Sequence, residues 1–463
     1  MSDRVNGFDS HPLIVQYLDR VCGHIKAKAV HEDIRHELLA HLEELAEERS
    51  FQDDISLDEK VSGVLKKMGD PEEVGKGLHT AHKPKPEWGV IALVASMVCI
   101  ALISILALAL SNLTGNLSIK QDLLYGFIGI AVMIALYFSD YRKLLRFSWP
   151  LYGLTLLVLV ASYLLHLYML FGVPRDALSE SHLTTFYMIY VHLFDLSPYL
   201  FLISFAGILQ LQKERKQEGG TQSPFAKLMV NTGLFALLPI LMYTQSTSLN
   251  YFVTYCAGLA VLLVVAGNKK LRRSVGVSAT VLMGLIVYFG NTSIGSHWIM
   301  ITSYLNSFRH YFTGQYHYSV SDHSLKLLES AGLWGQGFGM TLPYSPDSGF
   351  QFTYAVYSLG WVFGIIVVLV SILFIKRVLL MGALLKDGYA RGLVTGLITV
   401  LGVQLIWNLL MCMNLLPDNA INLPLMNWGM ITVIFEFAIV GLMLSAYRRK
   451  DMLSQRQLSG SIE

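Results

Sequence analysis

The chain has 463 residues, of which 53% are apolar and 15% are charged. An ordinary soluble domain carries about 25% charged residues, so this composition argues against a soluble globular protein. The net charge of +2 hides a division, because residues 1–88 carry a net charge of −6 and the remaining residues a net charge of +8. The acidic first part argues against nucleic acid as a partner.

Residues 1–88 are expected to form a small cytoplasmic helical domain that ends in a basic linker. Residues 31–49 place Ile and Leu side chains at the spacing of an amphipathic helix. Ser56 opens a capping box for the next helix, and Gly69 can end that helix in a left-handed conformation. Together, residues 11–82 predict three or four short helices.

The segment 68–74 reads MGDPEEV and resembles the small helical prefix domain that precedes various bacterial membrane proteins. That resemblance implies an interaction module without chemistry of its own. The nearby His36 and His41 lie five residues apart, about 140° around a helix, so they cannot share a metal ion as an i, i+4 pair can. No metal site is predicted here.

Ten apolar stretches follow residue 88. The first has 22 residues and no charge, which is enough to cross a hydrocarbon core about 30 Å thick at about 1.5 Å per residue. The expected spans are 89–110, 123–139, 147–171, 186–211, 228–243, 249–266, 275–289, 354–375, 393–412 and 423–446. The predicted fold class is all-α, a polytopic membrane bundle of about ten transmembrane helices over 89–450, with a cytoplasmic tail at 451–463.

The charges between the spans predict the orientation of the chain. If residues 1–88 are cytoplasmic, the inner connections and the C-terminal tail hold 19 Lys and Arg residues and the outer connections hold 4. Lys and Arg near the ends of spans stay preferentially on the cytoplasmic side. Both termini are therefore expected to be cytoplasmic.

The outer connection at 290–353 differs from the other outer loops in its length and its aromatic content. An unstructured linker contains few aromatic residues, so this loop is expected to fold back on the outer membrane face. Arg309 and Lys326 are its only Lys or Arg residues, and they suit an anionic ligand such as a lipid phosphate. The alternative is that its aromatic residues anchor the loop at the headgroups.

A glycine-rich stretch lies inside this loop. Residues 332–339 contain four glycines, and glycine allows sharp turns and close approach of the backbone to a ligand. Gly335, Gly337 and Gly339 are therefore candidates for substrate binding. Runs of this kind also serve simply to connect elements.

Three motifs resemble the SEDS family, the FtsW, RodA and SpoVE proteins of bacterial cell-wall synthesis. Residues 330–339 read SAGLWGQGFG and are followed by LP at 342–343, which resembles a GGxxGKGxG element followed by LPE and HTDF. Residues 416–429 read LPDNAINLPLMNWG and resemble LPVTGIPLPFISYG. Residues 196–198 look like a reduced QPSE element. Gln404 and Asn408 stand where the family often has Gln and Asn.

The resemblance implies processive glycan polymerisation in the bacterial cytoplasmic membrane. Proteins of this family are similar in using lipid II at the outer membrane face and in working beside a class B penicillin-binding protein. In them, a loop aspartate is thought to act as a base on the acceptor sugar hydroxyl, because a carboxylate within hydrogen-bond reach can take its proton. The diphosphate leaving group needs cationic or metal stabilisation, so a divalent cation is compatible with the resemblance.

The chain departs from the family pattern at this chemistry. Alignment from Phe350 backwards puts Gly349 at the family aspartate, and alignment from 342–343 forwards puts Ser348 there. Asp347 is the one carboxylate between Glu329 and the next span. It is the candidate catalytic base, and its alternative role is that of a turn residue in a Pro-Asp-Ser-Gly sequence. Further family acids are missing near 245–250 and 357–360.

Two acidic residues lie inside predicted spans. Glu436 is near the middle of the last span, where a carboxyl group is costly and is a functional candidate by default. A neutral, hydrogen-bonded glutamic acid is the alternative. Asp195 lies near the outer end of the fourth span, where it could face an outward cavity.

Three functions remain open at this point. The first is a SEDS-like protein that acts on a lipid-linked cell-wall precursor, as a glycan polymerase or as a diverged relative. The second is a non-catalytic partner that binds lipid or provides a scaffold for a cell-wall synthase. The third is a lipid flippase or transporter, against which stand the absence of a convincing inverted repeat and the few ionisable residues in the spans.

Overall fold

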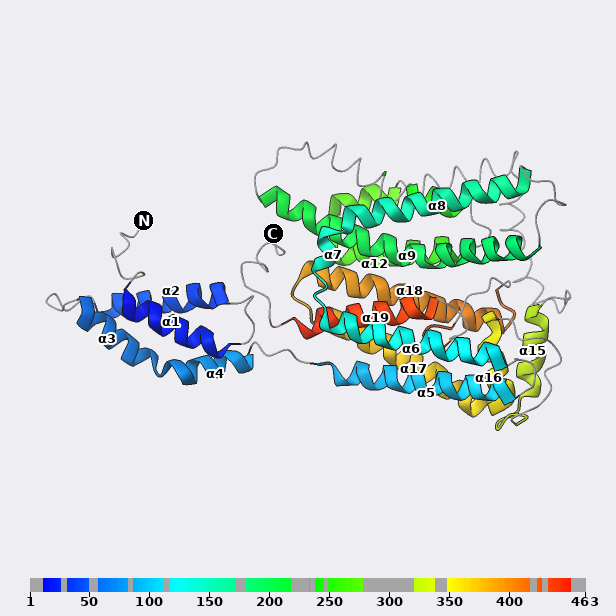
Figure 1. The fold of residues 1–463 in the computed structure, drawn as a ribbon, viewed down its shortest axis with the longest axis horizontal. Coiled ribbons are helices and arrows are strands. Elements are labelled where there is room, and N and C mark those ends of the chain that lie inside the picture. Colours follow the sequence, from blue (N-terminus) through cyan, green and yellow to red (C-terminus); the bar gives the residue numbers. More distant parts are fainter. Residues whose placement is uncertain are drawn as a thin grey trace. The chain divides into compact units, whose positions relative to one another are not determined.

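The computed structural model describes residues 11–25, 31–49, 57–81, 86–110, 116–171, 180–217, 233, 238–244, 249–267, 269–277, 320–337, 348–416, 423–426 and 432–450. These parts of the chain are helices joined by turns, with no strand among them (Figure 1). The all-α prediction is therefore confirmed. The chain divides into two compact units, one of residues 1–86 with 447–463 and one of residues 87–446.

The first unit contains four helices, which are α1 (Pro12–His24), α2 (His31–Arg49), α3 (Leu57–Met68) and α4 (Pro71–Ala81). Helix α1 begins at a proline, whose missing N–H would have had no partner in the first turn, and His11 caps it by accepting a hydrogen bond from the backbone of Leu13. Gly69 has a φ of 96° and separates α3 from α4, as predicted.

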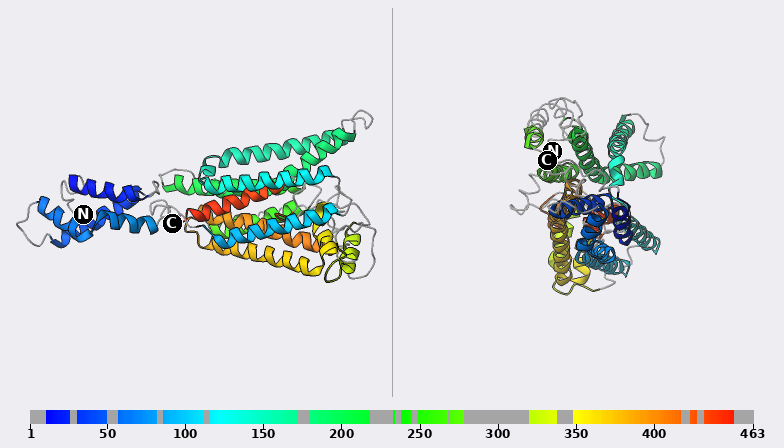
Figure 2. Two further views of the ribbon diagram at one scale, coloured as in Figure 1. Left: turned by 60° about the horizontal axis from the view of Figure 1, so that its bottom comes forward. Right: turned by 90° about the vertical axis from the view of Figure 1, so that its left-hand side faces the viewer.

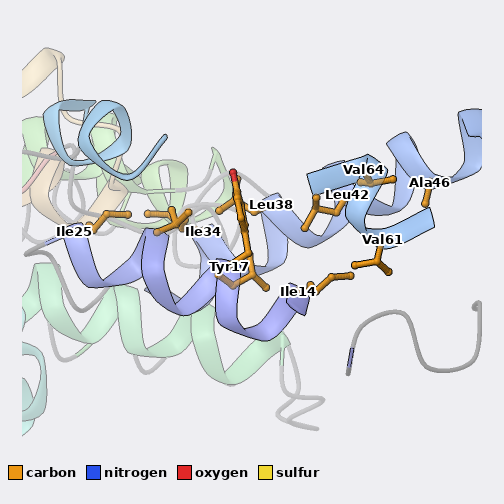
Figure 3. Close-up of a cluster of buried hydrophobic side chains, with 11 residues drawn as sticks. Ile14, Tyr17, Ile25, Ile34, Leu38, Leu42, Ala46, Val61 and Val64 are labelled. Carbon is orange, nitrogen blue, oxygen red and sulfur yellow. The ribbon is translucent and has the colours of Figure 1, made fainter. Parts of the chain in front are cut away.

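Apolar side chains from all four helices meet in one core, to which α4 contributes the partly buried Val74 and Leu78. Ile14, Leu42, Val61 and Val64 are fully buried there (Figure 3). The hydroxyl of Tyr17 donates a hydrogen bond to the carbonyl of Gly69, at 3.2 Å, and so connects α1 to the α3–α4 turn. The role of this unit as an interaction module stays a prediction.

The Cys22 thiol reports on the integrity of this core. Cys22 is 3% exposed, and burial raises the pKa of its thiol, although the nearby Arg35 acts in the opposite direction. The thiolate is the reactive form. We therefore expect slow labelling of Cys22 by a maleimide in the folded protein.

Leu42→Ala is expected to destabilise the first unit by about 2–5 kcal/mol, since it leaves a cavity in the core. Labelling of Cys22 in the full-length protein should then become at least about 30-fold faster when it follows local opening. Leu13→Ala is the matched control, because Leu13 is exposed. A Cys22→Ser variant gives the background from the other cysteines. Equal rates for Leu42→Ala and the wild type would contradict the described core.

The second unit is a bundle of apolar helices that run roughly parallel (Figures 1 and 2). Its main helices are α5 (Trp88–Leu110), α6 (Asn116–Phe138), α8 (Ser148–Phe171), α9 (Glu180–Gln217), α12 (Leu249–Ala266), α17 (Trp361–Ala383), α18 (Gly388–Cys412) and α19 (Thr432–Arg448). Shorter elements are α7 (Lys143–Arg146), α11 (Leu238–Thr244), α15 (Val320–Ser330), η4 (Ser348–Phe350) and α16 (Gln351–Leu359). Within the described residues, five helices are long and apolar enough to cross a membrane, and two shorter apolar helices accompany them.

Two predicted spans need correction. The span expected at 354–375 is broken at Gly360, whose φ of 89° ends α16 and starts α17 in a new direction. The span expected at 423–446 starts with a turn at residues 423–426, in which Leu425 has a φ of 63°, and its described helix is α19. The spans expected at 228–243 and 275–289 lie largely outside the described residues.

Helix α18 is the central support of the bundle, since it packs against α9, α12 and α17. Glycines make the close approach possible. A Cβ atom at Gly258 of α12 would lie 2.4 Å from Leu202 Cδ1 of α9 and 3.0 Å from Val400 Cγ2 of α18. Small residues at such crossings allow membrane helices to pack through van der Waals contact.

Candidate functional site

The glycine-rich segment 331–337 docks on the junction between α16 and α17 by backbone contacts. The segment follows α15 directly. Its backbone and the backbone of the junction each donate hydrogen bonds to the other. The four bonds run from Gln336 N to Tyr357 O (2.9 Å), Gly337 N to Ser358 O (3.0 Å), Trp361 N to Gly332 O (3.1 Å) and Val362 N to Leu333 O (3.2 Å). The segment is therefore held by four backbone hydrogen bonds, without side chains between the two backbones.

The contact requires glycine on both sides. A Cβ atom at Gly335 would lie 2.3 Å from Ser358 O and 2.5 Å from Gly360 N, and a Cβ atom at Gly360 would lie 2.2 Å from Leu333 O. Both glycines also have a positive φ, of 77° and 89°, a conformation that glycine adopts at little cost.

These contacts explain why residue 335 is a glycine without involving a ligand. Gly337 has a φ of 92° with open space around its missing side chain, so a backbone approach by substrate remains a prediction for it. Gly339 lies outside the described residues.

Two side-chain bonds connect the end of α15 to the glycine-rich segment and to α17. The amide of Gln336 donates to Ser330 O at 2.5 Å, and the indole of Trp361 donates to Leu328 O at 3.0 Å. The last turn of α15 thus has partners for carbonyl groups that a helix end leaves free.

A buried polar network joins α15, η4, α16 and the end of α18. The amide of Asn408 donates to the carbonyl of Gly349 at 2.8 Å. The hydroxyl of Ser324 lies 2.6 Å from that of Thr353 and donates to Cys412 O at 2.9 Å. All of these side chains are buried, where an unmade hydrogen bond costs more than at the surface. The network therefore holds the start of α16 against α18.

A second polar group lies one turn deeper on α18. Gln404 accepts a hydrogen bond of 2.5 Å from the hydroxyl of Tyr199 on α9. Glu436 of α19 is buried and accepts a hydrogen bond of 2.6 Å from the backbone of Leu425. Asp195 lies one turn from Tyr199 on α9, is half-buried, and acts electrostatically on Glu436.

The polar groups of α18 lie along one face of this helix. Gln404, Asn408 and Cys412 are spaced four residues apart, so their side chains follow each other over about 12 Å of helix. Hydroxyl, amide and carboxyl groups can bind the hydroxyls of a sugar. Among the described residues no group of three His, Cys, Asp or Glu side chains could hold a metal ion, and a divalent cation stays a prediction.

Apart from Gly335 and Gly337 of the docked segment, the predicted site residues fall into three sets. Asp195, Gln404 and Glu436 lie around Tyr199 of α9, and Asn408 lies one turn further along α18, bonded to Gly349. Lys326 lies apart from them, exposed on α15. Asp347 and Arg309, like Gly339, lie outside the described residues.

Sequence reasoning missed Ser324, Thr353 and Tyr199. No motif marks them, since their partners lie far away along the chain. Of the α18 residues on this face, the family resemblance singled out Gln404 and Asn408 but not Cys412.

Alanine at the docking glycines tests the backbone contact. Gly335→Ala and Gly360→Ala should each destabilise the folded protein by about 3 kcal/mol or more, because the added methyl group meets the backbone of the opposite segment. Gly332→Ala is the matched control, since Gly332 has a φ of 68° and open space around it, and should cost about 1–2 kcal/mol. Thermal unfolding in detergent measures the order, and equal shifts in all three variants would contradict the docking.

Replacement of Asn408 tests the buried network. Asn408→Leu keeps the side-chain volume but leaves the Gly349 carbonyl without its donor, which should cost about 1–3 kcal/mol. Thr399→Val is the control on the same helix, because Thr399 bonds only within α18 in the described structure. The melting temperature should fall clearly more for Asn408→Leu. A larger fall for Thr399→Val would argue against the network.

The profile of the family described as cell cycle protein, which groups FtsW, RodA and SpoVE, matches residues 87–452. The probable peptidoglycan glycosyltransferase FtsW of Geobacter metallireducens is 23% identical over 342 residues, which cover 72% of this chain and 85% of that protein. The protein of the same name from Taylorella equigenitalis is 32% identical over 130 residues, which cover 26% of this chain and 35% of that protein.

Solved structures show the same fold. A chain of a peptidoglycan synthase complex superposes with a TM-score of 0.54 at 18% identity, covering 79% of this chain and 98% of that one. The rod shape determining protein RodA of Thermus thermophilus gives a TM-score of 0.51 at 18% identity, covering 79% and 97%. The chain is an integral membrane protein that belongs to the FtsW/RodA/SpoVE cell cycle protein family.

Proposed function

We propose that this protein acts in bacterial cell-wall synthesis as a glycan polymerase that uses a polyprenyl diphosphate-linked sugar precursor, lipid II, at the outer membrane face. The observation that carries the proposal is the family match over 87–452, supported by relatives named as probable peptidoglycan glycosyltransferases. The ordered glycine-rich segment at one end of the bundle supplies a rigid surface near which such a precursor could be bound.

The proposed orientation puts both termini in the cytoplasm. Its support is the distribution of Lys and Arg, 19 on one side and 4 on the other. In this orientation α15, the glycine-rich segment and the network around Asn408 belong to the outer side. A class B penicillin-binding protein is the proposed partner, because a chain with this fold belongs to a peptidoglycan synthase complex.

Asp347 is the proposed general base. A sugar hydroxyl of the acceptor attacks the anomeric carbon of the donor, its proton passes to the carboxylate, and the polyprenyl diphosphate leaves. Asp347 directly precedes η4, whose Gly349 carbonyl is bound by Asn408, so a buried contact lies two residues from the proposed base. Lys326, Arg309 or a divalent cation would offset the charge of the leaving diphosphate.

A non-catalytic role is the second candidate. In this role the protein binds the lipid precursor or provides a scaffold for a synthase. The observation in its favour is the loss of family acids, since Ser348 or Gly349 stands at the aligned aspartate. Tyr357 and Ser358, which stand in the region of another missing acidic pair, use their carbonyl groups to hold the glycine-rich segment.

A polymerisation assay with lipid II separates the two candidates. The full-length protein, together with its cognate penicillin-binding protein, should form glycan, and Asp347→Asn should reduce the rate by at least about 100-fold, the lower range for a general base. Glu329→Gln is the matched control, because Glu329 is the nearest upstream carboxylate and is exposed. It should keep the wild-type rate.

Two other outcomes would change the proposal. Full activity of Asp347→Asn would remove Asp347 from the mechanism while leaving the polymerase in place. Binding of lipid II without glycan formation by the wild type, in the presence of its partner, would favour the non-catalytic role.

A further inference from the structure

The glycine-rich segment presents two large apolar side chains outwards. Leu333 is 66% exposed and Trp334 is 79% exposed, which is the highest value for a large apolar side chain among the described residues. An exposed tryptophan gains little from water around its ring and usually finds an apolar or interfacial environment. We call these two residues the Leu333–Trp334 tip.

The tip stands on a rigid base. The backbone of Leu333 accepts a hydrogen bond from Val362, and the residues on either side of the tip, Gly332 and Gly335, are fixed by the contacts with the α16–α17 junction. The exposure of the two side chains is therefore a property of a held backbone.

The apolar surface continues from the tip down α17. The exposed side chains of α17 that form this surface are Val362, Ile365, Ile366, Leu369, Ile372 and Leu373. Val362 is itself bonded to Leu333. A continuous exposed face of this kind on an apolar helix of membrane-spanning length is suited to lipid acyl chains.

A second exposed tryptophan marks the other end of α17. Trp88, at the start of α5, is 72% exposed. Its neighbour Glu87 accepts a hydrogen bond of 2.7 Å from Arg377 Nε of α17, and a Cβ atom at Gly89 would lie 2.9 Å from the same nitrogen. Gly360 and Arg377 are 17 residues apart, about 25 Å along a helix.

This distance is close to the thickness of a bilayer hydrocarbon core, about 30 Å. The separation of Gly360 and Arg377, beside which the two tryptophans lie, therefore matches that of the two boundaries between headgroups and acyl chains, where tryptophan is enriched in membrane proteins. Arg377 and Glu87 lie at the polar level beside one of them.

We propose that the Leu333–Trp334 tip is a membrane anchor, which inserts into the headgroup–acyl boundary of the leaflet on the α15 side, the outer leaflet in the proposed orientation. The occupant of this surface is lipid. The anchor fixes the height of the glycine-rich segment relative to the bilayer, so that the segment lies at the level of the headgroup of any lipid-linked ligand.

Depth-dependent fluorescence quenching tests the anchor in the full-length protein in lipid nanodiscs. The signal is the tryptophan emission of the wild type minus that of Trp334→Phe, which isolates the contribution of Trp334. Quenchers are phosphatidylcholine brominated near the top of the acyl chains and, separately, aqueous iodide. Trp88→Phe gives the same difference for a tryptophan at the opposite boundary. Because Trp334 is exposed, its replacement removes no packing from the fold.

The anchor predicts that brominated lipid lowers the Trp334 emission several-fold more than iodide does, as for Trp88. Quenching by iodide alone would place Trp334 in water and overturn the proposal. Protection from both quenchers would mean that protein covers the tip, for example a second copy of the chain, and would overturn it as well. The result does not depend on Asp347 or on glycan synthesis.

Discussion

The arrangement of this end of the bundle depends on one contact, in which two backbones meet where no side chain fits. Gly335 and Gly360 face each other so closely that a methyl group on either would overlap the opposite backbone segment. Four hydrogen bonds can form between the two segments because no side chain lies between them. The contact fixes the segment after α15 to the helix bundle, at the break between α16 and α17.

Helix α18 holds the elements around this contact in place through buried hydrogen bonds. Asn408 binds the carbonyl of Gly349, and the carbonyl of Cys412 accepts from Ser324, so one helix end holds both α15 and the start of α16. Inside a low-dielectric bundle, groups of this kind are costly when unpaired and stabilising when paired. The same helix face carries Gln404 deeper into the bundle, so a structural network and a candidate binding surface are continuous.

The sequence predicted what depends on composition along the chain and missed what depends on contacts across it. Long apolar runs predicted the membrane helices, and the family resemblance singled out Gln404 and Asn408. The break at Gly360 could not be predicted, because a glycine inside an apolar run resembles any small residue of a span. Only the segment that packs against Gly360 shows why a glycine is needed there. For the same reason the glycine-rich motif suggested a ligand site, whereas at Gly335 the close neighbour is the protein itself.

Hydrogen exchange of the segment 331–337, followed by mass spectrometry on the full-length protein in nanodiscs, tests the docking contact most directly. The amides of Gln336 and Gly337 lie in a loop whose side chains are largely exposed, yet both donate to carbonyl groups of α16. These amides are expected to exchange far more slowly than those of an unstructured peptide of the same sequence. Exchange at the unstructured rate would show that the segment does not dock on α16 and α17.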